Sequence, residues 1–299
     1  MPDSFPDQTE KQLDRRKEQL SDLITDVLRH HPMLCYFQGY HDIVQVLLLV
    51  LGVENAGPVV AHLSLLRIRD FMLPSLSPAL THLKLLPSIL LCVDSELCHH
   101  LSQTQPFFAL AATLTLYAHD IQEYGDIARL FDFLLAQEAV ISIYLFAVII
   151  LCRREELFEI PADEPEMLHS ILSKLPKPLD LEALISKTME LYEKHPPEKL
   201  PFRVWWWISS NSVLRTTRNL AAKQTLEDGE KLFQKQASEL RRKEASERAM
   251  AAIRKYQRPA TTVGFAVFIG VLSFWLRKGG TENIAGSIFR RVREALRSQ

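Results

Sequence analysis

Apolar residues that recur at the spacing of an α-helix restrict the possible folds of this chain more than any other feature of its sequence. Two segments show the pattern clearly, with apolar side chains at Leu20, Leu23, Ile24, Val27 and Leu28, and again at Ile127, Leu130, Phe131 and Leu134. This spacing places the apolar side chains of each segment on one face of a helix. No segment alternates apolar and polar residues convincingly as a half-buried strand does, and no tight hairpin signal occurs. The sequence therefore predicts an all-α fold.

Several further helices are expected between turn-forming residues. They cover residues 43–51, closed by Gly52, and residues 57–72, 79–103, 106–120, 164–174 and 179–194. Between Glu138 and Arg153 lies an uncharged run, residues 139–152, which is too short to cross a bilayer. We expect this run to be a buried helix in the core of the domain.

The composition argues against several classes of protein. With 299 residues, 47% of them hydrophobic and 24% charged, the chain can bury one large core or two modest ones. A formal net charge of −1 and the lack of a basic stripe in the first 200 residues argue against nucleic-acid binding. The four cysteines form no CxxC pair, which suits reduced thiols in the cytosol, and the N-terminus lacks the apolar run of a secretory signal.

A second uncharged run, residues 259–276, lies near the C-terminus between Arg258 and the pair Arg277 and Lys278. Its 18 residues are close to the lower length limit of a transmembrane helix, and Trp275 stands where an interfacial anchor would. The basic flanks favour a membrane span over the alternative, a buried helix of a soluble domain. Because only a short tail, residues 277–299, follows, we expect a tail anchor that leaves the preceding domain in the cytosol.

We interpret residues 201–258 as a linker and basic helical stalk between the domain and the predicted span. The segment begins near Trp205, Trp206 and Trp207 and continues into an Ala/Gln/Glu/Lys/Arg-rich helical pattern. Two roles stay open for the tryptophans, which either rest on the membrane interface or cover the last helix of the domain. The basic residues before the span either attract anionic lipid or form a solvated helix face.

Generic catalytic and metal-binding patterns are lacking. Cys98, His99 and His100 are adjacent, as are His30 and His31, but neighbouring residues on a helix point about 100° apart and do not converge on one metal or one reaction. The motifs of nucleotide-binding loops, serine hydrolases and zinc peptidases are absent from the sequence. We therefore expect no metal site and no cofactor bound by this chain itself.

The stretch CYFQGYHDIV, residues 35–44, places several polar side chains at the start of an apolar helix. Such a cluster either caps the helix or faces a ligand, because polar atoms there need partners. Its Y-x-Q-G pattern resembles the motif of the TBC domain, the helical catalytic domain of Rab GTPase-activating proteins. LRIRDFMLPSL at residues 66–76 and RLFDFLLAQ at residues 129–137 are similar to later landmarks of that domain. With the C-terminal span, the chain most resembles the endoplasmic-reticulum-anchored members, whose partners are Rabs of the early secretory pathway.

The resemblance implies a multi-helix TBC domain over residues 10–200, after a short tail at residues 1–9. It also implies that Gln38 takes the place of the GTPase's own glutamine and orients the attacking water, with Tyr36 packed beside it and Gly39 permitting close backbone approach. GTP and Mg²⁺ would belong to the partner GTPase. The expected partner contacts are Tyr36, Gly39, Tyr40, His41 and Asp42. In the alternative interpretation, Gln38 only caps the following helix.

The family also supplies an arginine from an I-x-x-D-x-x-R motif, which has no counterpart at the expected distance before Gln38. Leu23, Asp26 and Arg29 obey a similar spacing, but Arg29 stands only nine residues before Gln38, so we interpret it as a look-alike in the last turn of a helix. The resemblance thus predicts a domain whose first helices are missing. Its activity should be small unless Arg15, Arg16 or Arg29 takes the missing position.

Three functions from different classes follow. The first is a GTPase-activating protein for a Rab of endoplasmic-reticulum-to-Golgi traffic, held in the endoplasmic reticulum membrane, with the Golgi membrane as an alternative. The second is a Rab-binding protein that does not accelerate hydrolysis, and the third is a tail-anchored scaffold without a GTPase partner. Apolar faces left open by missing helices, such as the stripe from Leu20 to Leu28, would favour a homodimer or another covering partner.

Overall fold

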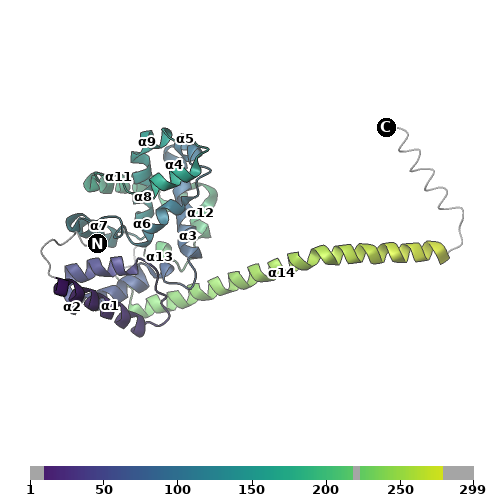
Figure 1. The fold of residues 1–299 in the computed structure, drawn as a ribbon, viewed down its shortest axis with the longest axis horizontal. Coiled ribbons are helices and arrows are strands. Elements are labelled where there is room, and N and C mark those ends of the chain that lie inside the picture. The colour runs from purple at the N-terminus through teal and green to yellow at the C-terminus, as the bar shows by residue number, and fades with distance from the viewer. Residues whose placement is uncertain (1–9, 218–222, 279–299) are drawn as a thin grey trace. The chain divides into compact units, whose positions relative to one another are not determined.

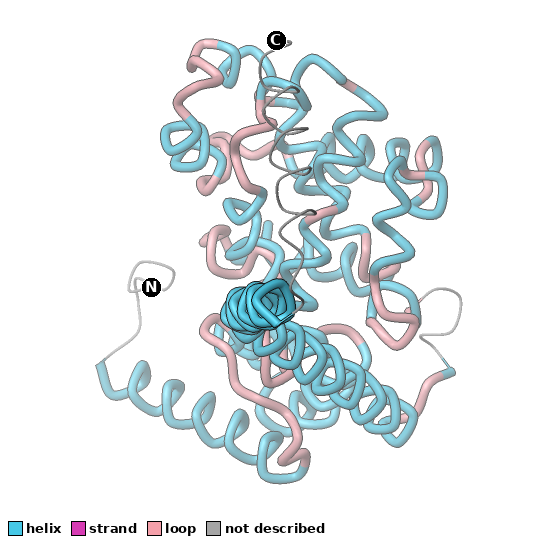
Figure 2. Tube along the Cα trace, turned by 90° about the vertical axis from the view of Figure 1, so that its right-hand side faces the viewer, coloured by secondary structure: helices cyan, strands magenta, loops and turns pink. Residues whose placement is uncertain are grey.

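The computed structural model describes residues 10–217 and 223–278, and every regular element in these ranges is a helix. Figure 2 shows helices joined by loops, without a strand in the described part of the chain, which confirms the all-α prediction. The α-helices are α1 (Glu10–His30), α2 (Tyr40–Leu66), α3 (Ser77–Leu83), α4 (Leu85–Val93), α5 (Ser95–His100), α6 (Leu110–Leu114), α7 (Tyr124–Ala136), α8 (Ile141–Cys152), α9 (Arg154–Phe158), α10 (Pro165–Leu172), α11 (Leu181–Lys194), α12 (Val204–Trp207), α13 (Val213–Thr216) and α14 (Leu226–Lys278). The 3₁₀ helices are η1 (Arg69–Phe71), η2 (Pro106–Ala109), η3 (Pro197–Lys199) and η4 (Pro201–Arg203).

The chain divides into two compact units, Met1–Ser238 and Glu239–Gln299. The first unit contains every element from α1 to α13 and the first turns of α14. It also carries all residues that are expected to contact a GTPase. The described residues of the second unit form one continuous helix that ends at Lys278.

Helix α8 lies in the core of the first unit, as its uncharged sequence predicts. All residues from Ile141 to Ile150 are buried, and α4 and α11 pack against this helix (Figure 1). A helix without a polar face loses stabilisation wherever it meets water, at about 25 cal/mol per Å² of apolar surface. Burial on every side is therefore the stable arrangement for this segment.

Helices α1 and α2 lie side by side (Figure 1). Helix α2 is interrupted at Gly52, whose φ of 75° and ψ of 169° are non-helical, so two helical stretches meet at a kink. These stretches correspond to the helices expected at 43–51 and 57–72, although the first already begins at Tyr40 and the second ends at Leu66. The apolar stripe of α1 faces α2 only in part, with Val27 buried and its other members partly exposed.

Among the described residues, α2 is one helix that is long and apolar enough to cross a membrane, judged by length and composition alone. A core helix passes the same test, and α2 buries Ile43, Val44 and Val60 completely inside the first unit. We therefore assign α2 to the core of the domain. The expected C-terminal span, residues 259–276, lies within α14, but most of its side chains fall outside the described residues, so the span stays a prediction.

The single helix expected at residues 79–103 is divided into α3, α4 and α5. Helix α4 ends because Asp94 is extended, with φ of −143° and ψ of 90°. The Asp94 carboxylate then accepts a hydrogen bond from the Leu97 N–H at 2.9 Å and begins α5. A side-chain cap of this kind both stops one helix and starts the next.

The helix expected at residues 106–120 is also shorter than predicted. It consists of η2 and α6 and ends at Leu114, because Leu116 and Tyr117 have φ of 50° and 67°. Positive φ is unusual for large L-residues and cannot continue an α-helix. Residues 115–118 therefore form a tight turn, which is part of the site described below.

The expected boundary at residue 200 does not hold in the structure, because residues 201–217 pack into the first unit. Asp70, which has no exposed surface, accepts a hydrogen bond from the Val213 N–H at 3.1 Å and another from the Ser212 hydroxyl. His82 Nε2 lies 2.9 Å from the same carboxylate.

Arg69 donates to the carbonyl oxygen of Asn211 and, at 2.6 Å, to Thr216 Oγ1. We call Arg69, Asp70, His82 and Ser212 the Arg69–Asp70 clasp, and it makes residues 201–217 part of the domain.

The three tryptophans of residues 205–207 differ in burial, and the structure supports the covering role for Trp205 alone. Trp205 is only 3% exposed and covers the domain, in a segment that packs against α4. Trp206 and Trp207 are 56% and 62% exposed, and the Arg215 guanidinium lies 5.2 Å from the Trp206 ring. Neighbouring residues on one helical turn point in different directions, which explains why a single run of tryptophans serves both the core and the surface.

Candidate functional site

The loop between α1 and α2 is fixed to the core by aromatic side chains. Phe37 and Tyr40 are buried, and their rings lie 5.7 Å apart, while Phe37 also meets Phe71 of η1 edge-on at 6.1 Å. The Cys35 N–H donates to the Met72 carbonyl at 2.8 Å. These contacts hold the backbone on both sides of Gln38. Residue 38 therefore has a defined position although its own side chain points outward.

Gln38 is exposed, and its side chain forms no hydrogen bond within the part of the chain that the structure describes. The residue that precedes α2 is Gly39, and no side chain caps this helix. The alternative in which Gln38 serves as a helix cap is thus not what the structure shows. A planar amide that can both donate and accept is left available to a partner.

Gly39 is required at its position for two physical reasons. Its φ is +101°, which L side chains rarely adopt. A Cβ atom at residue 39 would also lie 2.5 Å from Cγ2 of Thr115, in the turn that follows α6. The structure thus gives Gly39 a reason within the chain itself, while the close approach expected toward a partner stays a prediction.

Polar side chains beside Gln38 form a continuous series of contacts, which we call the Tyr36–His119 chain: Tyr36, His41, Asp42 and His119. The Tyr36 hydroxyl lies 2.9 Å from His41 Nδ1, and His41 Nε2 lies 3.4 Å from Asp42 Oδ1. Asp42 Oδ2 lies 3.2 Å from His119 Nδ1. Asp42 is 8% exposed, whereas the side chains of His41 and His119 are 45% and 64% exposed. The chain thus runs from the surface beside Gln38 through a buried carboxylate to the turn after α6.

The electrostatic environment keeps the hydroxyl of Tyr36 protonated. Burial and then the negative charge of Asp42 raise the pKa of Tyr36 above its ordinary value. Burial also raises the pKa of Asp120, next to His119, and the charge of Asp42 adds to this effect while His119 opposes it. At neutral pH, the Tyr36 hydroxyl therefore keeps its hydrogen.

Of the five expected partner contacts, the structure buries Gly39, Tyr40 and Asp42, and it places Tyr40 deepest in the core. Tyr40 has no exposed surface, and its hydroxyl is 2.7 Å from Ser64 Oγ inside the domain. Burial raises the pKa of Tyr40 to about 12 although the Ser64 hydrogen bond opposes this. Tyr40 is thus a core residue, as its place on the inner face of α2 requires. Tyr36, Gln38 and His41 remain on the surface.

Arg29 lies in the last turn of α1, as expected, and its side chain is exposed. No ion pair or hydrogen bond of this guanidinium occurs among the described residues. A cation at the C-terminus of a helix interacts favourably with the helix dipole, which explains its position without a catalytic role.

Two residues of the site were missed by sequence reasoning. Thr115 and His119 lie about eighty residues after Gln38, inside a segment that we expected to be helical. No local motif marks them, because their role depends on the left-handed turn at Leu116 and Tyr117. To identify Thr115 and His119 from the sequence alone, one would have to know that this turn contacts the start of α2.

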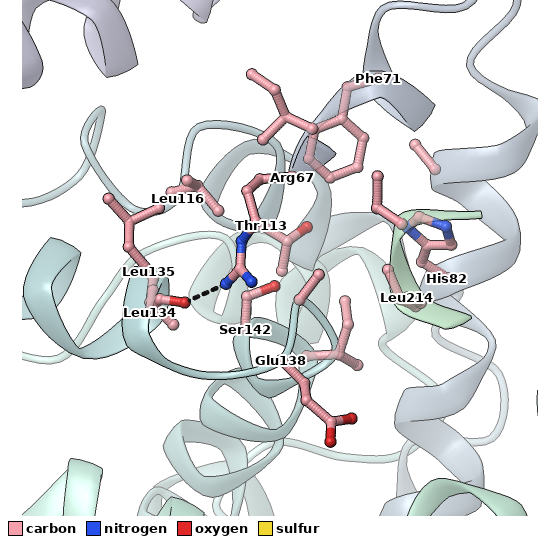
Figure 3. A pocket seen from close by; sticks show the side chains of 15 residues that line it. Arg67, Phe71, His82, Thr113, Leu116, Leu134, Leu135, Glu138, Ser142 and Leu214 are labelled. Carbon is pink, nitrogen blue, oxygen red and sulfur yellow. Dashed lines mark hydrogen bonds between the residues drawn. The ribbon is translucent and has the colours of Figure 1, made fainter. Parts of the chain in front are cut away.

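The landmark RDFM, residues 69–72, belongs to the clasp and not to the exposed site. The Ser212 hydroxyl donates to the Asp70 carboxylate, so this Ser/His/Asp group is not arranged for attack on a substrate. Figure 3 shows the small cavity nearby, where Arg67 extends between α6 and α7 and donates to the Leu134 carbonyl at 2.6 Å. Its volume of about 20 Å³ accommodates one water molecule. Among the described residues, no three His, Cys, Asp or Glu side chains are placed to hold a metal ion.

The Rab-GTPase-TBC domain family matches residues 1–158, and the chain belongs to this family. The chain is similar to GTPase-activating protein gyp10 of Schizosaccharomyces pombe, with 35% identity over 232 residues, or 76% of this chain and 62% of that protein. It is also similar to TBC1 domain family member 20 of Homo sapiens and of Bos taurus, with 36% identity over 197 residues in each case, or 65% of this chain and 49% of each relative. The chain therefore spans about half to three fifths of the length of these relatives.

Proposed function

We propose that this chain accelerates GTP hydrolysis by a small GTPase of the Rab class and supplies Gln38 to the reaction in trans. The observation that carries the proposal is the exposed, unpartnered amide of Gln38 on a backbone fixed by Phe37 and Gly39. Membership in the Rab-GTPase-TBC domain family and the name of the Schizosaccharomyces pombe relative support this activity.

The chemistry requires an in-line water and stabilisation of the charge that develops on the transferred phosphoryl group. The Gln38 carbonyl can accept a hydrogen bond from the water while its N–H₂ donates to a phosphate oxygen. Tyr36 and His41 flank this amide and would contact the partner. GTP and Mg²⁺ are the partner's own, and this chain contributes an orienting group and no cofactor.

The second candidate function is Rab binding without acceleration. The observation that favours it is the place of Arg29, the arginine that fits the L-x-x-D-x-x-R spacing, in the last turn of α1 only nine residues before Gln38. An arginine finger contributes about 10³- to 10⁵-fold in rate. If no arginine reaches the phosphates, the surface around Gln38 would hold a Rab without activating it.

We further propose that the chain acts at the endoplasmic reticulum membrane on a Rab of the early secretory pathway. The uncharged run of residues 259–276 and its basic flanks support a tail anchor, with the first unit in the cytosol. The exposed rings of Trp206 and Trp207 fit a location near a lipid interface, where tryptophan is enriched.

Single-turnover GTP hydrolysis by a panel of early-secretory Rabs tests the activity. The full chain is reconstituted into vesicles and compared with Gln38→Ala, Arg29→Ala and the matched control Gln103→Ala, another exposed glutamine. We expect acceleration that falls by about 100-fold or more in Gln38→Ala, because one orienting and donating group is lost, and that is unchanged in Gln103→Ala. Retention of a GTP-loaded Rab without acceleration would favour the binding function. A chain that neither retains nor activates any of these Rabs would exclude both functions.

A further inference from the structure

The turn that carries His119 is strongly constrained by the core. Tyr117 is 1% exposed and donates its hydroxyl hydrogen to the Ser142 carbonyl of α8 at 2.7 Å. Its N–H donates to the Ala112 carbonyl at 2.7 Å, and Ala118 N–H to the Thr115 carbonyl at 3.1 Å. These bonds hold two successive large residues at positive φ, a conformation that persists only where the surroundings enforce it. The position of His119 is therefore set by the core and not by a flexible loop.

This turn touches the start of α2 at two points on the side of Gln38. Thr115 Cγ2 packs where Gly39 lacks a side chain, and His119 Nδ1 reaches the Asp42 carboxylate. The second contact joins residues 77 positions apart in the sequence. Both contacts flank residue 38 from the C-terminal side, so a displacement of the turn would move the first turn of α2.

One arrangement of hydrogens is compatible with all contacts of the Tyr36–His119 chain. In this arrangement, Asp42 Oδ2 accepts from the N–H of His119 Nδ1, and His41 carries a hydrogen on Nε2, which lies 3.4 Å from Asp42 Oδ1. In a neutral His41 this leaves Nδ1 as an acceptor for the Tyr36 hydroxyl. One carboxylate thereby orients both histidines, and His41 in turn orients the tyrosine on the other side of Gln38.

We propose that His119 is a positioning residue for Gln38. Through Asp42 and His41 it holds Tyr36 and the first turn of α2, so that the backbone that carries Gln38 keeps one position from which the amide can reach the phosphates of the partner GTPase. The inference rests on the proposed function for its effect on hydrolysis, but the contacts that carry it lie within this chain and can be tested without a partner.

The rate test separates positioning from binding. Single-turnover hydrolysis is measured over a range of concentrations of the full chain, with His119→Ala, His119→Asn and the control His99→Ala, an exposed histidine of α5. We expect His119→Ala to lower the maximal rate by about 10- to 100-fold, the cost of a small misplacement, without raising the half-saturating concentration. His119→Asn should restore most of the rate, because its amide N–H can take the place of Nδ1–H.

A second readout does not need an active Rab. In the chain labelled with nitrogen-15 histidine, ring signals at mildly alkaline pH should show a proton on Nδ1 of His119 and on Nε2 of His41. His119→Ala should shift the His41 ring signals, and His99→Ala should leave them unchanged. The proposal is overturned by a His119 ring without a proton on Nδ1, by His41 signals indifferent to His119→Ala, or by a rate that His119→Asn does not restore. A wild-type chain that shows these signals but accelerates no Rab would refute the proposed function alone.

Discussion

At the scale of single residues, the site depends on two missing groups, a bonding partner for the Gln38 amide among the described residues and a Cβ atom at Gly39. Gln38 is available because no neighbour bonds its amide among the described residues, and its backbone turns outward because Gly39 has no Cβ. Asp42 has the opposite character, since its buried carboxylate is satisfied by two histidines. An exposed group next to a fully satisfied one is the arrangement expected of a preorganised contact surface.

Replacing Gly39 tests this description directly. Gly39→Ala should destabilise the fold by about 1 to 3 kcal/mol from backbone strain, with a further cost from the contact with Thr115. Gly52→Ala is the matched control, because Gly52 also has positive φ but nothing lies within 4 Å of an added Cβ. Urea unfolding should thus show a larger loss at residue 39 than at residue 52. Adding Thr115→Ser, which removes Cγ2, should recover the difference; equal losses at the two glycines would contradict the close contact.

At the scale of elements, the Arg69–Asp70 clasp explains why the domain extends past residue 200. Asp70 is reached by Ser212 and Val213, which precede and begin α13, and by His82 of α3. Burial alone would raise the pKa of Asp70, but the hydrogen bond and charge of His82, the charge of Arg69 and the Ser212 hydroxyl outweigh it and hold the pKa below its ordinary value. The clasp thus links three segments through one ionised carboxylate.

The stability of the clasp should depend on pH with a definite sign. A carboxylate whose pKa is lowered by folding stabilises the fold above its unfolded pKa, about 3.9, and this contribution is lost as the pH falls through the folded pKa. Asp70→Asn should lower the free energy of unfolding at neutral pH by about 3 to 5 kcal/mol, since the buried Arg69 loses the compensating charge of Asp70, and Ser212 and Val213 lose a charged acceptor. Urea unfolding as a function of pH measures both effects. The control Asp132→Asn, at an exposed position of α7, should leave the profile unchanged. An acid limb equally steep in Asp70→Asn would show that this carboxylate is not responsible.

At the scale of the whole molecule, the chain combines a helical domain with a long helix whose C-terminal part carries the uncharged run. The first unit buries a core around α8, and α2 belongs to that core although its length and composition would suit a membrane. The run at residues 259–276 belongs to the second unit, which begins at Glu239. Membrane attachment is therefore a property to test on the complete chain.

Two charges in the run should abolish membrane attachment. Val267→Lys with Val271→Lys should shift the full chain from the alkali-resistant membrane fraction to the soluble fraction, because each lysine near the centre of a span costs about 3 kcal/mol. Ala251→Lys with Ala252→Lys, at exposed positions of α14, is the control and should not change fractionation. A chain that stays soluble before any substitution would contradict the tail anchor.

Local spacing and short motifs were enough to predict the helical class, the buried α8 and the choice of Gln38 as the candidate site residue. Tertiary contacts were needed to show that Tyr40 belongs to the core, that residues 201–217 pack into the domain and that His119 contacts Asp42. These facts depend on contacts between residues far apart in the chain, which arise from how buried groups satisfy one another. The helix expected at 79–103 is divided by a local cap at Asp94. The helix expected at 106–120 ends at a left-handed turn, which the distant contact of Tyr117 with Ser142 stabilises.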